Sequence, residues 1–387
     1  MADQLLEDLD TVKKEFSIYL DLVRFMAAVM VVIYHSNIRK LTLEELPMTG
    51  HGHTAVMIFF VLSGYVIAYI ASTREKTPVD YWSSRLSRFY SIAIPVVLLT
   101  PLLDLAGQAM APEFYPAGRT THDLWFLRMF ASLTYLNEIW SLSIQSFSNV
   151  PYWSLCYEMW YYALFAIATF MKGSKRAVLL VVTALFLGPK IMILAPIWVL
   201  GVVLYRWQRL YELPEWTCWV LFLASIAGYG LFQEYQLTEL GSEWLRELIG
   251  DYWHKQATFS RSFITDYPLA LIIAANFVGF RGIAHRFSAP LLAFERPIRW
   301  VASFTFSLYL LHQPLLQFFS ALIPGDNTQP WYYLSVIACI FAAVIAISLV
   351  TERKRGVMRD WIKKHLLRLT ATRWWGRSFG AAARGAV

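Results

Sequence analysis

Two ionisable side chains lie in the first strongly apolar stretch of the chain. Residues 21–36, DLVRFMAAVMVVIYHS, contain one arginine, Arg24, near the start and one histidine, His35, near the end. Eleven helical positions correspond to about 1100°, close to three full turns, so both side chains lie on one face of a helix, about 16 Å apart. Ionisable groups in a membrane span are costly to insert and mark functional sites by default. Snorkelling of Arg24 and an ordinary interfacial hydrogen bond of His35 are the structural alternatives, but their shared face favours a functional site.

Three further charged residues extend this set. Arg85 and Arg88 lie three positions apart in YWSSRLSRFYSIAIP, where a third apolar stretch begins. Two guanidinium groups on one face suit phosphate or carboxylate ligands, although basic residues also flank spans for topological reasons. Glu158 lies about two turns inside the fourth apolar stretch, PYWSLCYEMWYYALF. We expect this intramembrane carboxylate to pair with His35 or Arg24.

Two more stretches contain candidate residues. Ser63 and Gly64 lie in the middle of AVMIFFVLSGYVIAYI, and small residues there predict the close approach of another helix. His312, in SFTFSLYLLHQPLL, is expected in the outer half of its span. Packing and a hydrogen bond ahead of Pro314 are the structural alternative for this histidine.

We expect no metal ion and no bound cofactor. His51 and His53, together with His35, could suggest a metal site, but the sequence has no His-x3-His spacing for a helix and no acidic ligand spaced for one. The three cysteines form no CxxC pair, and there is no glycine-rich phosphate loop.

The elements that must position these residues are transmembrane helices. Of the 387 residues, 57% are hydrophobic and only 16% are charged, whereas a soluble domain is about one quarter charged. Apolar stretches of about 20 residues recur, which is the length needed to cross a bilayer as a helix. The sequence therefore predicts an all-α, polytopic transmembrane fold of about ten spans. We place them near residues 17–37, 54–72, 89–109, 150–171, 175–189, 190–205, 216–232, 263–280, 298–320 and 331–350.

Charge sorting gives the expected orientation and domain limits. Most of the 34 lysines and arginines fall in alternate connections and in the tail, which the positive-inside rule assigns to the cytoplasm. Both termini are therefore expected to be cytoplasmic, with a segment 1–16, a transmembrane domain 17–352 and a basic tail 353–387. The loops 110–149 and 233–262 are expected outside, the second as an exposed amphipathic helix. The net charge of +7 thus reflects topology and implies no nucleic-acid partner. The tail is expected to lie as a helix on the anionic lipid of the inner leaflet.

Taken in order, these stretches resemble the acyltransferase-3 family, membrane enzymes that O-acylate sugars and other acceptors. The matching pieces are the Arg-x10-His spacing of Arg24 and His35, then FFVLSGY, RLSRFYSIAIP, WSLCYEMWYY and FSLYLLHQP, with Glu352 following in TERKRG. The resemblance covers roughly residues 18–355, and the order and spacing of the pieces are more specific than any one of them.

The resemblance implies an integral membrane O-acyltransferase. It would move an acyl group, acetyl in the first instance, from cytoplasmic acyl-CoA to a hydroxyl of a glycan or lipid-linked saccharide at the outer face. His35 is implied as the general base, because an imidazole takes up protons near neutral pH, and Glu158 would orient its ring. The residues implied for acyl-CoA binding are Arg24, Arg85, Arg88, Ser63 and Gly64. Those implied for the acceptor side are Trp153, Tyr162, Tyr309 and His312.

Several alternatives are left open. A transporter or flippase of a lipid-linked or small polar substrate would also have many spans with buried charges, and it would keep its function in a His35→Gln variant. A non-catalytic membrane scaffold is disfavoured because it has no need of ionisable residues in its spans. Direct transfer and an acyl-histidine intermediate are both compatible with the sequence, as are acetyl and succinyl donors and any oligomeric state. We expect a multi-pass protein of the bacterial plasma (inner) membrane.

Overall fold

The structure, a computed structural model, describes residues 14–38, 41–44, 46–47, 49–115 and 123–371. The expected N-terminal segment 1–16 and basic tail 353–387 therefore lie partly outside the described residues. The described residues form helices joined by turns and short connections, without a β-strand. Outside the helices, Ser146 and Asn149 form one isolated antiparallel β-bridge. The all-α fold class predicted from the sequence is confirmed.

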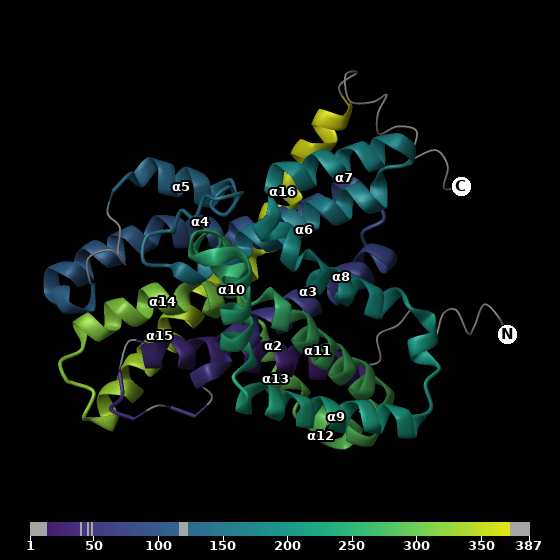
Figure 1. The fold of residues 1–387 in the computed structure, drawn as a ribbon. Helices are drawn as coiled ribbons and strands as arrows, with labels where there is room; N and C mark the ends of the chain where they lie inside the picture. The colour runs from purple at the N-terminus through teal and green to yellow at the C-terminus, as the bar shows by residue number, and fades with distance from the viewer. Residues whose placement is uncertain (1–13, 39–40, 45, 48, 116–122, 372–387) are drawn as a thin grey trace. The chain divides into compact units, whose positions relative to one another are not determined.

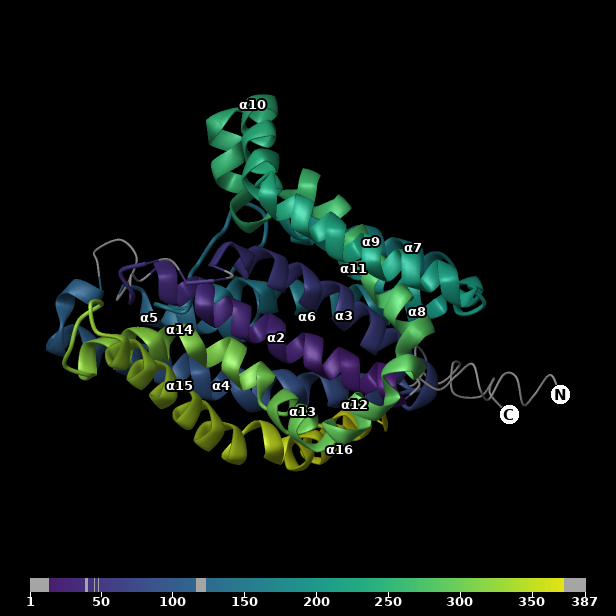
Figure 2. The same ribbon diagram turned by 90° about the horizontal axis from the view of Figure 1, so that it is seen from below.

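The chain divides into two compact units, each made of two separate stretches of sequence. The first unit comprises residues 1–70 and 189–305. Its elements are α2 (Lys14–Ile38), η1 (Thr49–His51), α3 (Gly52–Thr73), α8 (Pro189–Arg206), η4 (Gln208–Tyr211), α9 (Glu215–Glu234), α10 (Leu237–Ala257), η5 (Thr258–Ser260), α11 (Phe263–Ile283), η6 (Ala284–Phe287), α12 (Ser288–Ala293) and α13 (Glu295–Ala302). Within this unit α9 runs alongside α11 (Figure 1), and α10 projects away from that pair (Figure 2).

The second unit comprises residues 71–188 and 306–387. Its elements are α4 (Pro78–Met110), η2 (Pro112–Phe114), α5 (Trp125–Leu133), η3 (Val150–Tyr152), α6 (Trp153–Phe170), α7 (Gly173–Leu187), α14 (Thr305–Leu322), α15 (Pro330–Val350), η7 (Glu352–Lys354) and α16 (Arg355–Ala371). The tail helix α16 packs against α4, and the Lys363 ammonium lies 2.6 Å from the Asp80 carboxylate.

Among the described residues, seven segments are long and apolar enough to cross a membrane. They are Lys14–Asn37, Thr49–Thr73, Pro78–Met110, Pro189–Arg206, Glu215–Glu234, Leu237–Ala293 and Pro330–Thr370. Of the other three expected spans, 150–171 corresponds to α6, 175–189 to α7, which has only 15 residues, and 298–320 to α13 and α14 together. A polytopic membrane protein is therefore supported, whereas the number of spans and the side of the termini stay predictions.

The helices test three expectations about local structure. The stretch expected as one span at 298–320 is divided between α13 and α14, with a turn at residues 303–304. The acidic segment 233–262 does contain a helix, α10, whose glutamates are exposed. The tail likewise forms the helix α16, while its place on the inner leaflet stays a prediction.

The long helix α4, which carries Arg85 and Arg88, begins at a defined N-cap. The hydroxyl of Thr77 accepts a hydrogen bond from the Asp80 amide, and Pro78 occupies the first helical turn. Both features stabilise a helix start, because the cap satisfies a free amide and proline has none to satisfy. The cap therefore fixes where the two arginines fall along the helix.

Helices α3 and α8 of the first unit approach each other at two glycines. A Cβ atom on Gly64 would lie 2.0 Å from the Trp198 carbonyl oxygen, and one on Gly201 would lie 2.0 Å from the Val61 carbonyl oxygen. The indole Nε1 of Trp198 also donates to the Ser63 hydroxyl at 3.2 Å. The close helix approach predicted from Ser63 and Gly64 is confirmed.

We expect Gly201→Ala to lower the free energy of unfolding by about 1–3 kcal/mol, because the added methyl group meets backbone that cannot rotate away. Gly230→Ala is the matched control, since nothing lies within 4 Å of its Cβ position. That change should be neutral or stabilising by about 0.5–1 kcal/mol, because alanine has the higher helix propensity. Thermal unfolding of both variants in detergent is the measurement, and equal melting temperatures would contradict the tight contact.

Candidate active site

Arg85 forms a buried ion pair in the second unit. Its Nη2 lies 2.6 Å from Oε1 of Glu75, with the two residues 2% and 8% exposed. The guanidinium also lies 5.6 Å from the ring centroid of Tyr81 and 5.7 Å from that of Tyr162. Within the described residues, Nε of Arg85 and Oε2 of Glu75 are buried without a hydrogen-bond partner. The charge of Arg85 is therefore compensated inside the protein, and its predicted role in acyl-CoA binding stays a prediction.

Arg88 lies one turn further along α4 and is half-buried. Its guanidinium stands 5.4 Å from the ring centroid of Phe306. The guanidinium interacts electrostatically with Glu158 and Glu352, but none of the described residues forms an ion pair or a hydrogen bond with it. Of the two arginines predicted to bind a phosphate, Arg88 is the one whose donors are not engaged by the described part of the protein.

Glu158 belongs to the same unit as both arginines. Its Oε1 accepts a hydrogen bond of 2.5 Å from the hydroxyl of Tyr162, one helical turn along α6. The backbone carbonyl of Tyr162 in turn accepts a hydrogen bond from the buried hydroxyl of Tyr81. Tyr309 of α14 interacts electrostatically with Glu158. The structure thus brings the carboxylate together with two of the predicted acceptor-side tyrosines.

The remaining acceptor-side predictions are also in this unit. The hydroxyls of Tyr309 and Ser154 lie 2.7 Å apart. His312 is fully buried, and its Nδ1 lies 2.7 Å from the Tyr309 carbonyl oxygen. Trp153 is buried with its ring edge-on to Tyr157, at a centroid distance of 5.0 Å. These contacts fix the side chains, while their predicted role in acceptor binding is untested.

Two acids near Arg85 and Arg88, Glu75 and Glu352, had no role predicted from the sequence. Glu75 lies in the short connection between α3 and α4, where an acid reads as solvated. Glu352 was recognised as part of a motif only; it accepts hydrogen bonds from the Ser307 amide at 3.2 Å and hydroxyl at 2.8 Å. Glu352 therefore stabilises the first turn of α14. In the sequence, both acids lie next to a segment that carries an arginine or is expected to be buried, and that position could have marked them as candidates.

His35 belongs to the first unit, near the end of α2. Its Nδ1 lies 2.9 Å from the Val31 carbonyl oxygen, one turn earlier. A carbonyl oxygen can only accept, so Nδ1 carries the proton and the ring lone pair is at Nε2. The ring is half-buried and edge-on to Tyr34 at 5.0 Å. The backbone of α2 thus selects the tautomer in which Nε2 can accept a proton.

Arg24 takes part in an ion-pair network at the other end of α2. Its Nη1 lies 3.2 Å from Oδ1 of Asp21, and Oδ2 of Asp21 lies 2.9 Å from Arg299 of α13. Glu295 forms ion pairs with both Arg299, at 3.0 Å, and Lys14, at 2.7 Å. Hydrogen bonds from Lys14 and Arg299 lower the pKa of Glu295. Arg24 is therefore part of a charge network that ties α2 to α13.

The predicted partnership of His35 and Glu158 joins residues of the two different units. It stays a prediction. Ser63 and Gly64, also predicted for acyl-CoA, belong to the first unit, where they contact α8. Among the residues that the structure describes, no three His, Cys, Asp or Glu side chains are grouped so that they could hold a metal ion.

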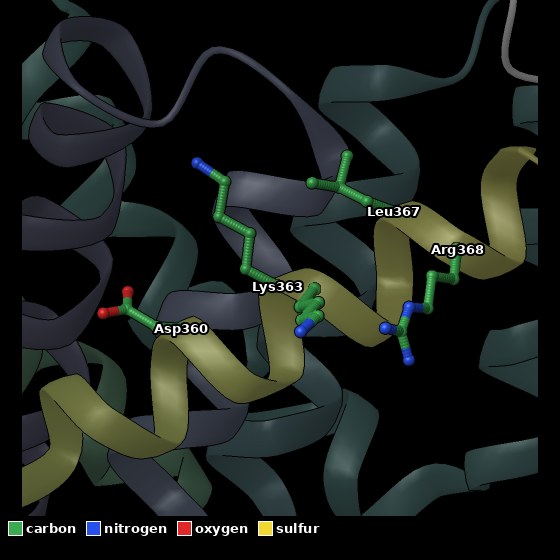
Figure 3. A pocket seen from close by; sticks show the side chains of 5 residues that line it. Asp360, Lys363, Leu367 and Arg368 are labelled. Atoms are coloured by element: carbon green, nitrogen blue, oxygen red, sulfur yellow. The ribbon is translucent and has the colours of Figure 1, made fainter.

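An open hollow of about 490 Å³ lies on the tail helix α16 (Figure 3). Its lining residues all come from this helix: Asp360, Lys363, Lys364, Leu367 and Arg368. Three cations on one short surface suit an anionic ligand such as a phosphate group. From the sequence, these residues are expected on a basic tail helix that lies on the anionic lipid of the inner leaflet.

The described residues form no strands, and several of their helices are apolar and long enough to cross a membrane. The protein is therefore an all-α polytopic membrane protein. The acyltransferase domain of the acyltransferase-3 family matches residues 17–353. The chain belongs to this family, as the order of its motifs predicted.

Two curated relatives give the comparison more detail. The exopolysaccharide production protein ExoZ of Rhizobium meliloti is 33% identical over 151 residues, which cover 36% of this chain and 42% of that protein. The peptidoglycan O-acetyltransferase OatA of Listeria monocytogenes is 23% identical over 358 residues, which cover 83% of this chain and 53% of that protein. The chain thus spans about half the length of these relatives. No solved structure matches it.

Proposed function

We propose that this protein is an integral membrane O-acyltransferase of the bacterial plasma membrane. It moves an acyl group, acetyl in the first instance, from acyl-CoA on the cytoplasmic side to a hydroxyl of a glycan or lipid-linked saccharide at the outer face. The observation that carries the proposal is the match of residues 17–353 to the acyltransferase domain, since this stretch includes His35, Arg88 and Glu158. The match favours acyl transfer over the transporter alternative.

In the proposed reaction His35 is the general base. Its Nε2 takes the proton of the acceptor hydroxyl while the oxygen attacks the thioester carbonyl. The carbon–sulfur bond then breaks, and the proton passes to the leaving thiolate, which gives the ester and free CoA. The hydrogen bond from Nδ1 of His35 to the Val31 carbonyl supports this role, because it keeps the lone pair on Nε2.

Arg88 is the proposed ligand of a donor phosphate. We expect Arg88→Ala to raise the KM for acetyl-CoA about ten-fold or more, because charge-assisted hydrogen bonds are worth roughly 1.5–3 kcal/mol. Arg176→Ala, at an exposed position of α7, is the matched control and should leave the KM unchanged. Initial rates at varied acetyl-CoA decide the matter, and an unchanged KM in Arg88→Ala would remove Arg88 from the donor site.

The proposed function is tested on cells with and without the gene. Mass spectrometry of their surface glycans should show O-acyl groups, as mass increments lost on mild alkali treatment, only when the wild-type chain is present. The mass of the increment distinguishes acetyl from succinyl. Glycans that keep every O-acyl group but no longer reach the surface in the deletion strain would instead favour the transporter alternative.

A further inference from the structure

A second histidine of the first unit is paired with a buried acid. Nε2 of His53, at the start of α3, lies 2.6 Å from Oδ1 of Asp266 in the first turn of α11. The side chain of His53 is 23% exposed, whereas that of Asp266 is 0% exposed. One side of the imidazole is thus exposed to solvent, while its Nε2 contacts a fully buried carboxylate.

The arrangement leaves one ring nitrogen of His53 available. Among the described residues, the hydrogen bond to Asp266 is the only one that the His53 ring makes, and Oδ2 of Asp266 is buried without a hydrogen-bond partner. The carboxylate accepts a hydrogen bond from Nε2–H, so the neutral ring has its lone pair on Nδ1. A buried carboxylate behind an imidazole fixes its tautomer and strengthens it as a proton acceptor. Nδ1 of His53 is therefore an oriented acceptor on a partly exposed ring.

Further polar groups surround the pair. Glu239 of α10 and Arg261, which precedes α11, both interact electrostatically with His53 and with Tyr34, and both are exposed. The ring of His51 is bonded to the hydroxyl of Tyr229. A carboxylate, a guanidinium, a phenol and an imidazole together offer both donors and acceptors, which suits a ligand with several hydroxyl groups.

The pair lies at the same end of the first unit as the proposed base. Tyr34 precedes His35 in α2, and a Cβ atom on Gly52, next to His53, would clash with the Tyr34 ring at 2.3 Å. The first turns of α10 contact the neighbouring segment, because Gly241 lies directly against Thr265, which precedes Asp266. His35 and His53 are thus on adjoining segments of chain.

The same helix α10 also carries exposed aromatic side chains. Trp244, Tyr252 and Trp253 of this helix are all exposed, although tryptophan is on average highly buried. Amphipathic rings of this kind pack against the apolar faces of a ligand while their polar edges stay in water. The helix that contacts the segment of Asp266 therefore also presents flat apolar surfaces.

We propose that Nδ1 of His53, held by Asp266, accepts a hydrogen bond from a hydroxyl of the saccharide acceptor and so positions the acceptor for acyl transfer. The inference rests on the proposed function and gives it an acceptor-binding residue. His53 takes no proton in the reaction, and its loss acts on acceptor binding and leaves donor binding as it is. An exclusively structural link between α3 and α11 is the competing explanation.

The test uses the full-length chain in nanodiscs, with radiolabelled acetyl-CoA as donor. The acceptor is the unacylated surface-glycan fraction extracted from cells that lack the gene. His53→Gln retains an amide that can donate to Asp266, so the link between the helices is kept while the Nδ1 acceptor is removed. We expect about a ten-fold or larger rise in the acceptor concentration for half-maximal rate, with an unchanged KM for acetyl-CoA and an unchanged melting temperature. His285→Gln, at an exposed position of η6 in the same unit, is the matched control and should behave as wild type.

Two results would overturn the inference. One is wild-type acceptor dependence in a folded His53→Gln protein; should that variant not fold, Asp266→Asn takes its place under the same criterion. The other is a parallel loss of melting temperature and of both donor and acceptor binding, which would show a purely structural link. Should the wild-type chain transfer no acyl group from either acetyl-CoA or succinyl-CoA, the proposed function fails, and a separate experiment tests the binding site. In that case the same glycan fraction should slow the modification of His53 by diethyl pyrocarbonate, measured by mass spectrometry, and an absence of protection counts against the site.

Discussion

His35→Ala is expected to lower the rate of acyl transfer by about 10²–10⁴-fold, the usual contribution of a general base. The imidazole is bonded through Nδ1 to the Val31 carbonyl, and its loss removes the proposed proton acceptor. The KM for acetyl-CoA should stay close to wild type, because Arg88 and the rest of the donor site are untouched. The measurement is the rate of radiolabel transfer from acetyl-CoA to the extracted glycan fraction at saturating donor.

The control for this experiment is His285→Ala. His285 lies in η6 of the same unit and is 48% exposed, near Glu215 at the surface, so its loss should leave the rate unchanged. Near-wild-type transfer by His35→Ala would remove His35 from the mechanism. Incubation of wild-type protein with labelled acetyl-CoA alone separates the two chemical routes. A hydroxylamine-sensitive label on the protein would indicate an acyl-enzyme, whereas direct transfer predicts none.

Glu75→Ala is expected to lower the free energy of unfolding by about 3–5 kcal/mol, because removal of one partner of a buried ion pair leaves the other charge unpaired. Arg85 is almost fully buried and lies 2.6 Å from Glu75, so water does not replace the lost carboxylate. Thermal or denaturant unfolding in detergent is the measurement. The double variant Glu75→Leu with Arg85→Met should recover most of the stability, because apolar residues of similar volume often replace a buried pair without loss.

A surface ion pair of the same unit provides the comparison. Asp123 and Arg128 lie 2.7 Å apart, but the Asp123 side chain is 63% exposed. Asp123→Ala should therefore leave the melting temperature close to that of the wild type, since solvent screens an exposed pair. Equal destabilisation by Glu75→Ala and Asp123→Ala would contradict the assignment of Glu75 and Arg85 as a buried pair.

Much of the fold could be predicted from the sequence because helix formation in a membrane depends on local hydrophobicity. Stretches such as residues 17–37 and 331–350 lie within α2 and α15, since an apolar run of this length satisfies its backbone hydrogen bonds only as a helix. The break between α13 and α14 was not predicted. No proline or glycine interrupts residues 299–310, so no local signal marks the turn.

The family could also be predicted from the sequence. Arg24 and His35, the Ser63–Gly64 pair, Arg88 and the later motifs stand at spacings that are visible without any structure. The domain match over residues 17–353 agrees with them. The residue types of the motifs and their order along the chain suffice for this recognition, because each motif is a short contiguous stretch of sequence.

The tertiary structure alone decided which charges are compensated. Arg85 and Arg88 are equivalent in sequence, yet Arg85 is paired with Glu75 and Arg88 has no ion pair among the described residues. His53 and Asp266 are 213 positions apart, and neither was given a role by its neighbours in the sequence. Hydrophobicity is a property of each segment and can be read locally, whereas the partner of a polar side chain depends on which helices pack together. The sequence by itself therefore determined the helices and the family, and only the packing decided the pairs.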